Sequence, residues 1–168
     1  MKNIALKIVT LFLLINSTAL FSQRPPVRPR MAAREIVITK IHAHRVIRRT
    51  AGVINIAYIK VKENKNYTGD LARAVAHQRF ARKLYRRGMY LRAIHHSRVG
   101  RIYAIKAIKA NKGADSNDYS FTAEEEELMK NPPSDQALMD ELTKDDPAQS
   151  NLKDQNVDVK DIDLDEKE

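Results

Sequence analysis

The stretch from Thr68 to Lys112 constrains the fold most, because it has the pattern of two helices joined at a glycine. Apolar residues recur at three- and four-residue steps on both sides of Gly88, which is the spacing of one helix face. The side chain of Thr68 or Asp70 offers an oxygen that can cap the first helix. Gly88 suits the left-handed position that ends it. We therefore predict a helical hairpin.

The centre of this hairpin, FARKLYRRGMYLRAI, resembles the centre of a tetratricopeptide repeat. Both have a small residue, a Leu-Tyr pair, a turn glycine, an aromatic residue and an Ala-Ile pair. In this chain these are Ala81, Leu84 with Tyr85, Gly88, Tyr90, and Ala93 with Ile94. The match covers residues 77–105, about one repeat unit of 34 residues, whereas arrays need about three units to bury a continuous core. Ser97, Gly100 and Ile105 depart from the pattern.

The resemblance implies an interaction scaffold built on a helix-turn-helix unit. The sequence contains no second copy of the pattern. An ordinary helical hairpin that obeys the same packing rules is the alternative interpretation.

A third helix is predicted over residues 33–62, because apolar residues recur there at helical spacing for about five turns. The abundance of Ile and Val leaves two strands joined at residues 50–52 as the alternative. Strict alternation fails at several positions, which favours the helix. Together with the hairpin it gives an all-α, three-helix bundle over residues 33–113, near the size at which one core is marginally stable. Apolar residues off the main stripe, such as Ile56 and Ile59, predict a homodimer.

The first 22 residues have the pattern of a secretory signal peptide. Lys2 and Lys7 give a positive start, residues 8–15 are apolar, and small residues precede a cleavage point near Ser22/Gln23. The apolar run is shorter than the roughly 20 residues that span a bilayer. We therefore expect cleavage and no stable membrane span afterwards, with an uncleaved anchor as the alternative.

Residues 23–32 are basic and rich in proline, which predicts an extended linker rather than a helix. The chain has no cysteine, so it has no disulfide and no thiolate site. Export without disulfides is typical of a bacterial envelope protein, in the periplasm or outside the cell.

The charge of the chain changes sign after Gly113. Residues 1–113 hold 25 Lys and Arg against 3 Asp and Glu, whereas residues 114–168 hold 5 against 18, so their net charges are +22 and −13. Thr122 to Glu125 is a capping box that predicts one short helix, and Ser134 can cap another. The segment is otherwise too charged and too poor in apolar residues for a core of its own. We predict a largely disordered acidic tail with two short, transient helices.

The basic part of the chain offers little for catalysis. Its only carboxylates are Glu35, Glu63 and Asp70, so no acid pair is evident for hydrolysis. No glycine-rich phosphate loop and no serine-elbow motif occurs. We predict a non-enzymatic protein that needs no cofactor.

The histidines do not have the spacing of a helical metal site, which needs two rings three or four residues apart. A metal carrier would need a site assembled between helices and is the least favoured function. We interpret His77 with Gln78 as a packed polar pair. The five histidines are His42, His44, His77, His95 and His96.

Cations on both hairpin helices are the stronger functional signal. The candidate partner-binding residues are Arg79, Arg82, Lys83, Arg86, Arg87, Arg92, Arg98 and Arg101. We predict an exported interaction or scaffold protein whose partner is a protein or an anionic polymer of the cell envelope. The alternative is a polyanion-binding protein, for nucleic acid, lipopolysaccharide or an acidic polysaccharide, whose affinity would fall steeply with salt.

The acidic tail bears on either function. Tethering raises the effective concentration of opposite charges to about the millimolar range, so many weak contacts can act together. We therefore predict that the tail folds back on the arginines and masks them. A solvated charged face, partly neutralised by the tail, is the alternative.

Overall fold

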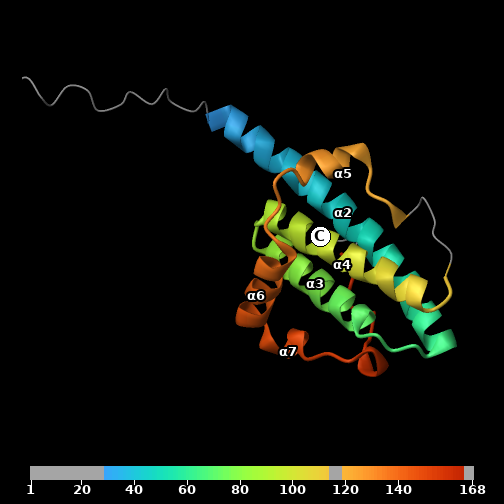
Figure 1. Cartoon of the computed structure of the whole chain (residues 1–168). Helices are drawn as coiled ribbons and strands as arrows, with labels where there is room; N and C mark the ends of the chain where they lie inside the picture. Colours follow the sequence, from blue (N-terminus) through green and yellow to red (C-terminus); the bar gives the residue numbers. More distant parts are fainter. Residues whose placement is uncertain (1–28, 114–118, 165–168) are drawn as a thin grey trace, which may run out of the picture. The chain divides into compact units, whose positions relative to one another are not determined.

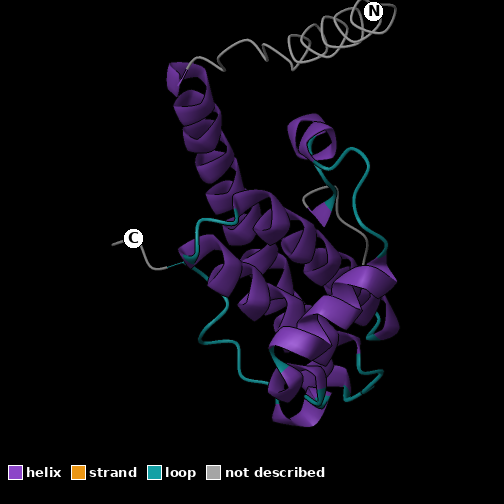
Figure 2. Cartoon of the chain, turned by 90° about the vertical axis from the view of Figure 1, so that its left-hand side faces the viewer, coloured by secondary structure: helices purple, strands orange, loops and turns teal. Residues whose placement is uncertain are grey.

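The computed structural model describes residues 29–113 and 119–164, with side chains from residue 36 onward. The predicted signal peptide, its cleavage point and residues 23–28 of the linker lie outside this part. The chain divides between Arg34 and Glu35, and the following description concerns the unit from Glu35 to Glu168. All regular elements of the described residues are helices (Figure 2), which confirms the all-α class.

Three helices build the core of this unit (Figure 1): α2 (Pro29–Asn64), α3 (Asp70–Arg86) and α4 (Tyr90–Ala110). The segment for which two strands were the alternative is one continuous helix, as predicted. The helix begins at Pro29, so the prediction of an extended linker is wrong for residues 29–32, because a proline is tolerated in the first turn of a helix. Ile54 of α2 and Ile108 of α4 are buried in one cluster, and Phe80 of α3 is buried in the next. In α2, burial of the apolar stripe outweighs the modest preference of the β-branched residues for strands.

The turn between α3 and α4 forms at Gly88, as predicted. Gly88 has φ 76°, and its amide donates to the carbonyl of Tyr85 at 2.9 Å. The next amide, that of Met89, donates to the carbonyl of Leu84 at 3.0 Å. This pair of hydrogen bonds is a Schellman motif, which requires a left-handed residue where glycine has no steric penalty.

A second glycine sets the distance between the two hairpin helices. A Cβ atom at Gly100 would lie 3.1 Å from the carbonyl oxygen of Ala74. That oxygen belongs to the backbone of α3, so it cannot move away as a flexible side chain would. The absence of a side chain at Gly100 therefore allows α3 and α4 to approach each other closely.

Residues 119–164 are more ordered than their composition predicted. They form α5 (Ala123–Leu128), α6 (Asp135–Asp145), α7 (Pro147–Ser150) and a 3-10 turn, η2 (Asp154–Asn156). The capping box at Thr122 and the Ser134 cap are present as predicted. The buried apolar side chains of this segment are Met129, Leu138, Leu142, Val157, Ile162 and Leu164.

The few apolar residues of the acidic segment explain this order. Five of them, all but Leu138, belong to the apolar clusters of the three-helix core, and burying a Leu or Ile side chain stabilises by about 1.5–3 kcal/mol. The prediction of disorder from composition tests only whether a segment has enough apolar residues to form a core of its own. This segment instead completes a core that the basic helices already provide, so the expectation of a largely disordered tail does not describe residues 119–164.

The start of α3 is capped from a distant part of the chain. Asp154 is buried, and its carboxylate accepts hydrogen bonds from the amides of Gly69 at 2.7 Å and Ala72 at 2.8 Å. The residue at the cap position, Gly69, has no side chain to do this. The predicted caps are absent: the Thr68 hydroxyl accepts only from the Asp70 amide, at 3.3 Å.

Replacing Asp154 by Ala is expected to lower the free energy of unfolding by about 2 kcal/mol, because two amides at a helix start lose a charged acceptor. Urea unfolding followed by circular dichroism measures the change. Asp161→Ala is the control, because the Asp161 side chain is exposed. Equal losses in the two variants would show that Asp154 is not a special cap.

Candidate partner-binding surface

Three of the predicted cations form ion pairs with the acidic helix α6 and its end. Arg98 on α4 lies 3.2 Å from Asp135, and Lys83 on α3 lies 3.3 Å from Asp146. Arg92 on α4 contacts Glu141. Exposed pairs of this kind contribute only about 0–1 kcal/mol each. They fix the orientation of α6 on the hairpin more than they stabilise it.

Between these ion pairs, α6 inserts its apolar face into the hairpin. Leu138 and Leu142, four residues apart, are both 1% exposed, and Met139 is partly buried beside them. The helix contacts both α3 and α4. This is the arrangement of a short amphipathic helix in a groove, with anchors at i and i+4.

Arg101 is a structural residue rather than a surface cation. Its guanidinium is fully buried and forms two hydrogen bonds with the carboxylate of Glu125, at 2.9 and 3.0 Å. It also donates to Thr50 on α2 at 3.1 Å and lies 4.7 Å from the Phe121 ring. The prediction that Arg101 contacts a partner is therefore not supported by its position.

Glu125 is ionised in this site. Burial raises the pKa of its carboxyl, but hydrogen bonds from Arg101 and from the Thr122 amide, with the charges of Arg101 and Arg49, hold it below its usual value. Arg49 on α2 approaches the same carboxylate at 2.8 Å. One acid of the C-terminal segment thus joins α2, α4 and α5.

The remaining candidate cations lie along α3. Arg82 is buried and donates to the backbone carbonyl of Asp161, whereas Arg79 donates to the carbonyl of Asp158 at 2.9 Å. Arg86 and Arg87 are exposed at the end of the helix. At least six of the eight predicted residues therefore contact the C-terminal segment. Nothing in the sequence indicated that the backbone carbonyls of Asp158 and Asp161 would be acceptors.

Two histidines form a buried pair across the hairpin. The Nδ1 atoms of His77 and His96 are 3.0 Å apart, and both side chains are fully buried. One ring must donate and the other accept, so the pair is compatible with neutral rings. Tyr103 stacks on His77 at 6.1 Å, and Phe80 packs edge-on against His96 at 4.7 Å.

The surroundings of this pair disfavour protonation. Burial lowers the pKa of His77 to about 3, with the charge of His96 as a second cause. Burial also lowers the pKa of His96 to about 4, followed by the charges of Arg92 and His95. Among the described residues, no group of three or more His, Asp or Glu side chains is arranged to hold a metal ion.

Gln78, predicted to pack beside His77, instead bonds to other parts of the chain. Its side-chain amide donates to the carbonyls of Ile47 and Ile162, each at 2.8 Å. Its carbonyl accepts from the Ser97 hydroxyl at 3.0 Å. One buried polar side chain thereby ties the C-terminal segment to all three core helices.

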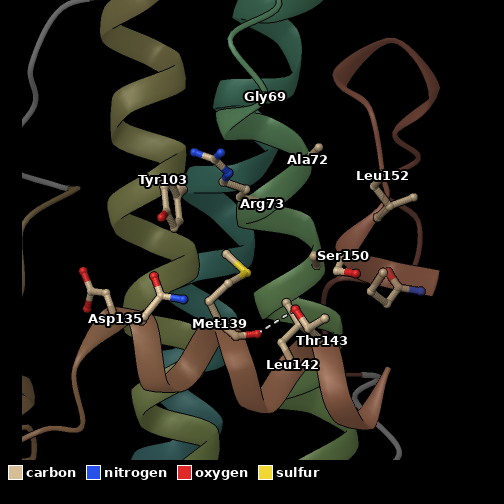
Figure 3. A pocket seen from close by; sticks show the side chains of 13 residues that line it. Gly69, Ala72, Arg73, Tyr103, Asp135, Met139, Leu142, Thr143, Ser150 and Leu152 are labelled. Carbon is tan, nitrogen blue, oxygen red and sulfur yellow. Dashed lines mark hydrogen bonds between the residues drawn. The ribbon is translucent and has the colours of Figure 1, made fainter. Parts of the chain in front are cut away.

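A cavity of about 610 Å³ lies between α3 and the helices α6 and α7 (Figure 3). Small side chains on α3, Ala72 and Ala76, leave the space, and Leu142 and Met139 of α6 face it. Arg73 stacks over Tyr103 at 5.5 Å on the same side. The contact between α6 and α3 is therefore incompletely packed.

Comparison with protein families, curated proteins and solved structures gives no match. The resemblance to a tetratricopeptide repeat therefore stays a prediction that rests on the sequence pattern alone. Within the described part of the chain, no helix has the length and apolar character needed to cross a membrane. The site is defined by its own geometry: a groove on α3 and α4, rimmed by cations and occupied by an acidic helix of the same chain.

Proposed function

We propose that this chain is an exported, non-enzymatic interaction protein. Its basic helical hairpin binds a partner at the surface that its own acidic segment now covers. Export is proposed from the pattern of residues 1–22. The binding role rests on one observation: Lys83, Arg92 and Arg98 form ion pairs with α6 and its end, and two leucines of α6 are buried between these pairs.

The same observation supports masking by the acidic segment. A surface that holds an acidic helix in cis presents the charges and the apolar sockets that would hold an acidic ligand in trans. The ion pairs at its rim are individually weak. A partner with similar features can therefore compete with α6 without breaking the buried pair of Arg101 and Glu125.

A charge-neutral variant of the full chain tests this function. Asp135→Asn/Glu141→Gln/Asp146→Asn removes the three acids that pair with the hairpin. Glu126→Gln/Glu127→Gln/Asp140→Asn is a matched control, because it changes the net charge equally at exposed positions that pair with no hairpin cation. Capture from a bacterial envelope extract, quantified by mass spectrometry, is expected to rise several-fold for the first variant only.

The same two variants distinguish the polyanion-binding alternative from binding of a protein partner. Heparin or DNA responds mainly to net charge, so both variants would gain affinity equally at low salt and lose it steeply as salt rises. Fluorescence anisotropy over a salt series measures this. If neither variant differs from the wild type in capture or in polyanion binding, the masked surface has no binding role.

A further inference from the structure

The helix α6 lies between two anchors that do not depend on it. Before it, Glu125 is bound to the buried Arg101, and Met129 is buried in the core. After it, Asp154 caps the start of α3. The segment between Met129 and Asp154 can therefore leave the hairpin while both of its ends stay attached.

The contacts that hold α6 on the hairpin are few and individually weak. Two leucines provide the buried area, and the three ion pairs around them have partly exposed partners. The cavity of about 610 Å³ lies under the same helix, so part of its inner face lacks the close packing of a protein interior. Regions with few buried contacts open more readily than the core does.

We propose that the groove under α6 is a docking site for an acidic amphipathic helix of a partner protein, for which α6 is an intramolecular substitute. This proposal rests on the proposed function and names the chemistry of the partner. The recognised pattern is that of α6: leucines at i and i+4, acids at i−3 and i+3, and a further acid at i+8, as in Asp135, Leu138, Glu141, Leu142 and Asp146.

The apolar sockets favour a helix over a polyanion. Leu138 and Leu142 are both buried on α6, which contacts α3 and α4, and Leu142 belongs to the same apolar cluster as Phe80 and Ile94. No phosphate or sulfate group would replace such apolar side chains. Displacement of α6 by a polyanion would leave those sockets exposed to water. A partner helix with two matching apolar anchors restores both the burial and the ion pairs. It differs from α6 only in lacking the high effective concentration that tethering gives to α6.

A synthetic peptide provides the probe. A fluorescent peptide of residues 132–147 is titrated with the full chain, with folding checked by circular dichroism. In the wild-type chain α6 occupies the groove, so binding is weak. In Leu138→Ala/Leu142→Ala the anchors of α6 are lost, and binding is expected to be at least about tenfold tighter. Asp135→Asn/Glu141→Gln/Asp146→Asn is the second opened variant, in case the leucine variant does not fold.

A charge exchange tests the register. In Arg92→Glu, a peptide carrying Glu141→Arg is expected to bind several-fold more tightly than the unmodified peptide, and the order is expected to reverse in the wild-type chain. The control peptide carries Asp140→Arg, since Asp140 lies on the exposed side of α6 and bonds only to Gln136 within it. This control is expected to show no preference between the two proteins.

Two results would overturn the proposal: equal peptide affinity in the wild-type and opened chains, or a charge exchange without a matched preference. Because the assay uses purified components, it is independent of capture from the envelope. Capture without peptide binding would leave the proposed function standing with a partner of different chemistry. Peptide binding without capture would support the groove and contradict the interaction role in the envelope.

Discussion

Replacement of Glu125 by Gln is expected to lower the free energy of unfolding by about 3–5 kcal/mol. The substitution keeps the shape of the side chain but leaves the Arg101 guanidinium, which is fully buried, without a neutralising carboxylate. Thr122 also loses the charged acceptor for its amide, which lies 2.9 Å from Glu125 Oε2. Urea unfolding at neutral pH measures the loss.

The matched control is Glu126→Gln, one residue further along α5 and exposed. It is expected to change stability by less than about 0.5 kcal/mol. The double variant Arg101→Met/Glu125→Leu is expected to recover much of the loss, because well-packed apolar residues can replace a buried ion pair at little net cost. A loss below about 1 kcal/mol for Glu125→Gln would show that solvent or Arg49 compensates for the missing charge.

Acidification from pH 7 to pH 5 is expected to lower the free energy of unfolding by about 4 kcal/mol through the histidine pair. In the unfolded chain each ring titrates near a pKa of 6.5, whereas burial holds the pKa of His77 at about 3 and of His96 at about 4. Below pH 6.5 the unfolded state binds more protons than the folded state, so the free energy of unfolding decreases as the pH is lowered. Between pH 7 and pH 5 the decrease is about 2 kcal/mol for each ring.

Other groups near the pair act in both directions but do not reverse this sign. Glu141 lies 3.5 Å from His96 Nε2, and the charge of Asp145 favours the protonated ring. Burial and the charge of Arg92 outweigh it. The Glu125 carboxyl, whose pKa is lowered, contributes stability above its unfolded pKa of about 4.5 and loses it only as pH falls further. The window from pH 7 to pH 5 therefore reports on the histidines.

The variant His77→Leu/His96→Leu tests this assignment. Urea unfolding at pH 7, 6 and 5 is expected to show a much flatter dependence on pH than in the wild type. Some slope is expected to remain, because burial also lowers the pKa of His95. An unchanged slope in the double variant would assign the acid sensitivity to other groups.

The local features of the helices could be predicted from the sequence. The periodic apolar stripe gave α2 as one helix, Gly88 gave the end of α3, and the capping box gave the start of α5. These features depend on residues within a few turns of one another, where helix spacing and capping chemistry decide the conformation.

The candidate site could be predicted only in part. Lys83, Arg92 and Arg98 were identified as binding residues, and they do hold an acidic segment. Arg101 has the same chemistry and the same helical spacing, yet it is buried. Whether an arginine faces solvent or an interior carboxylate depends on which acid the chain brings to it, and a pattern along one helix carries no such information.

By itself the sequence determined the helices, the turn at Gly88 and the division of charge between the basic helices and the acidic segment. Only the tertiary structure decided that Asp154 caps α3, that Glu125 neutralises Arg101, and that Leu138 and Leu142 fill a groove on the hairpin. The physical reason is the distance along the chain over which each kind of interaction acts. Periodicity and capping act over a few residues, whereas these contacts join residues 24 to 85 positions apart or depend on where α6 docks.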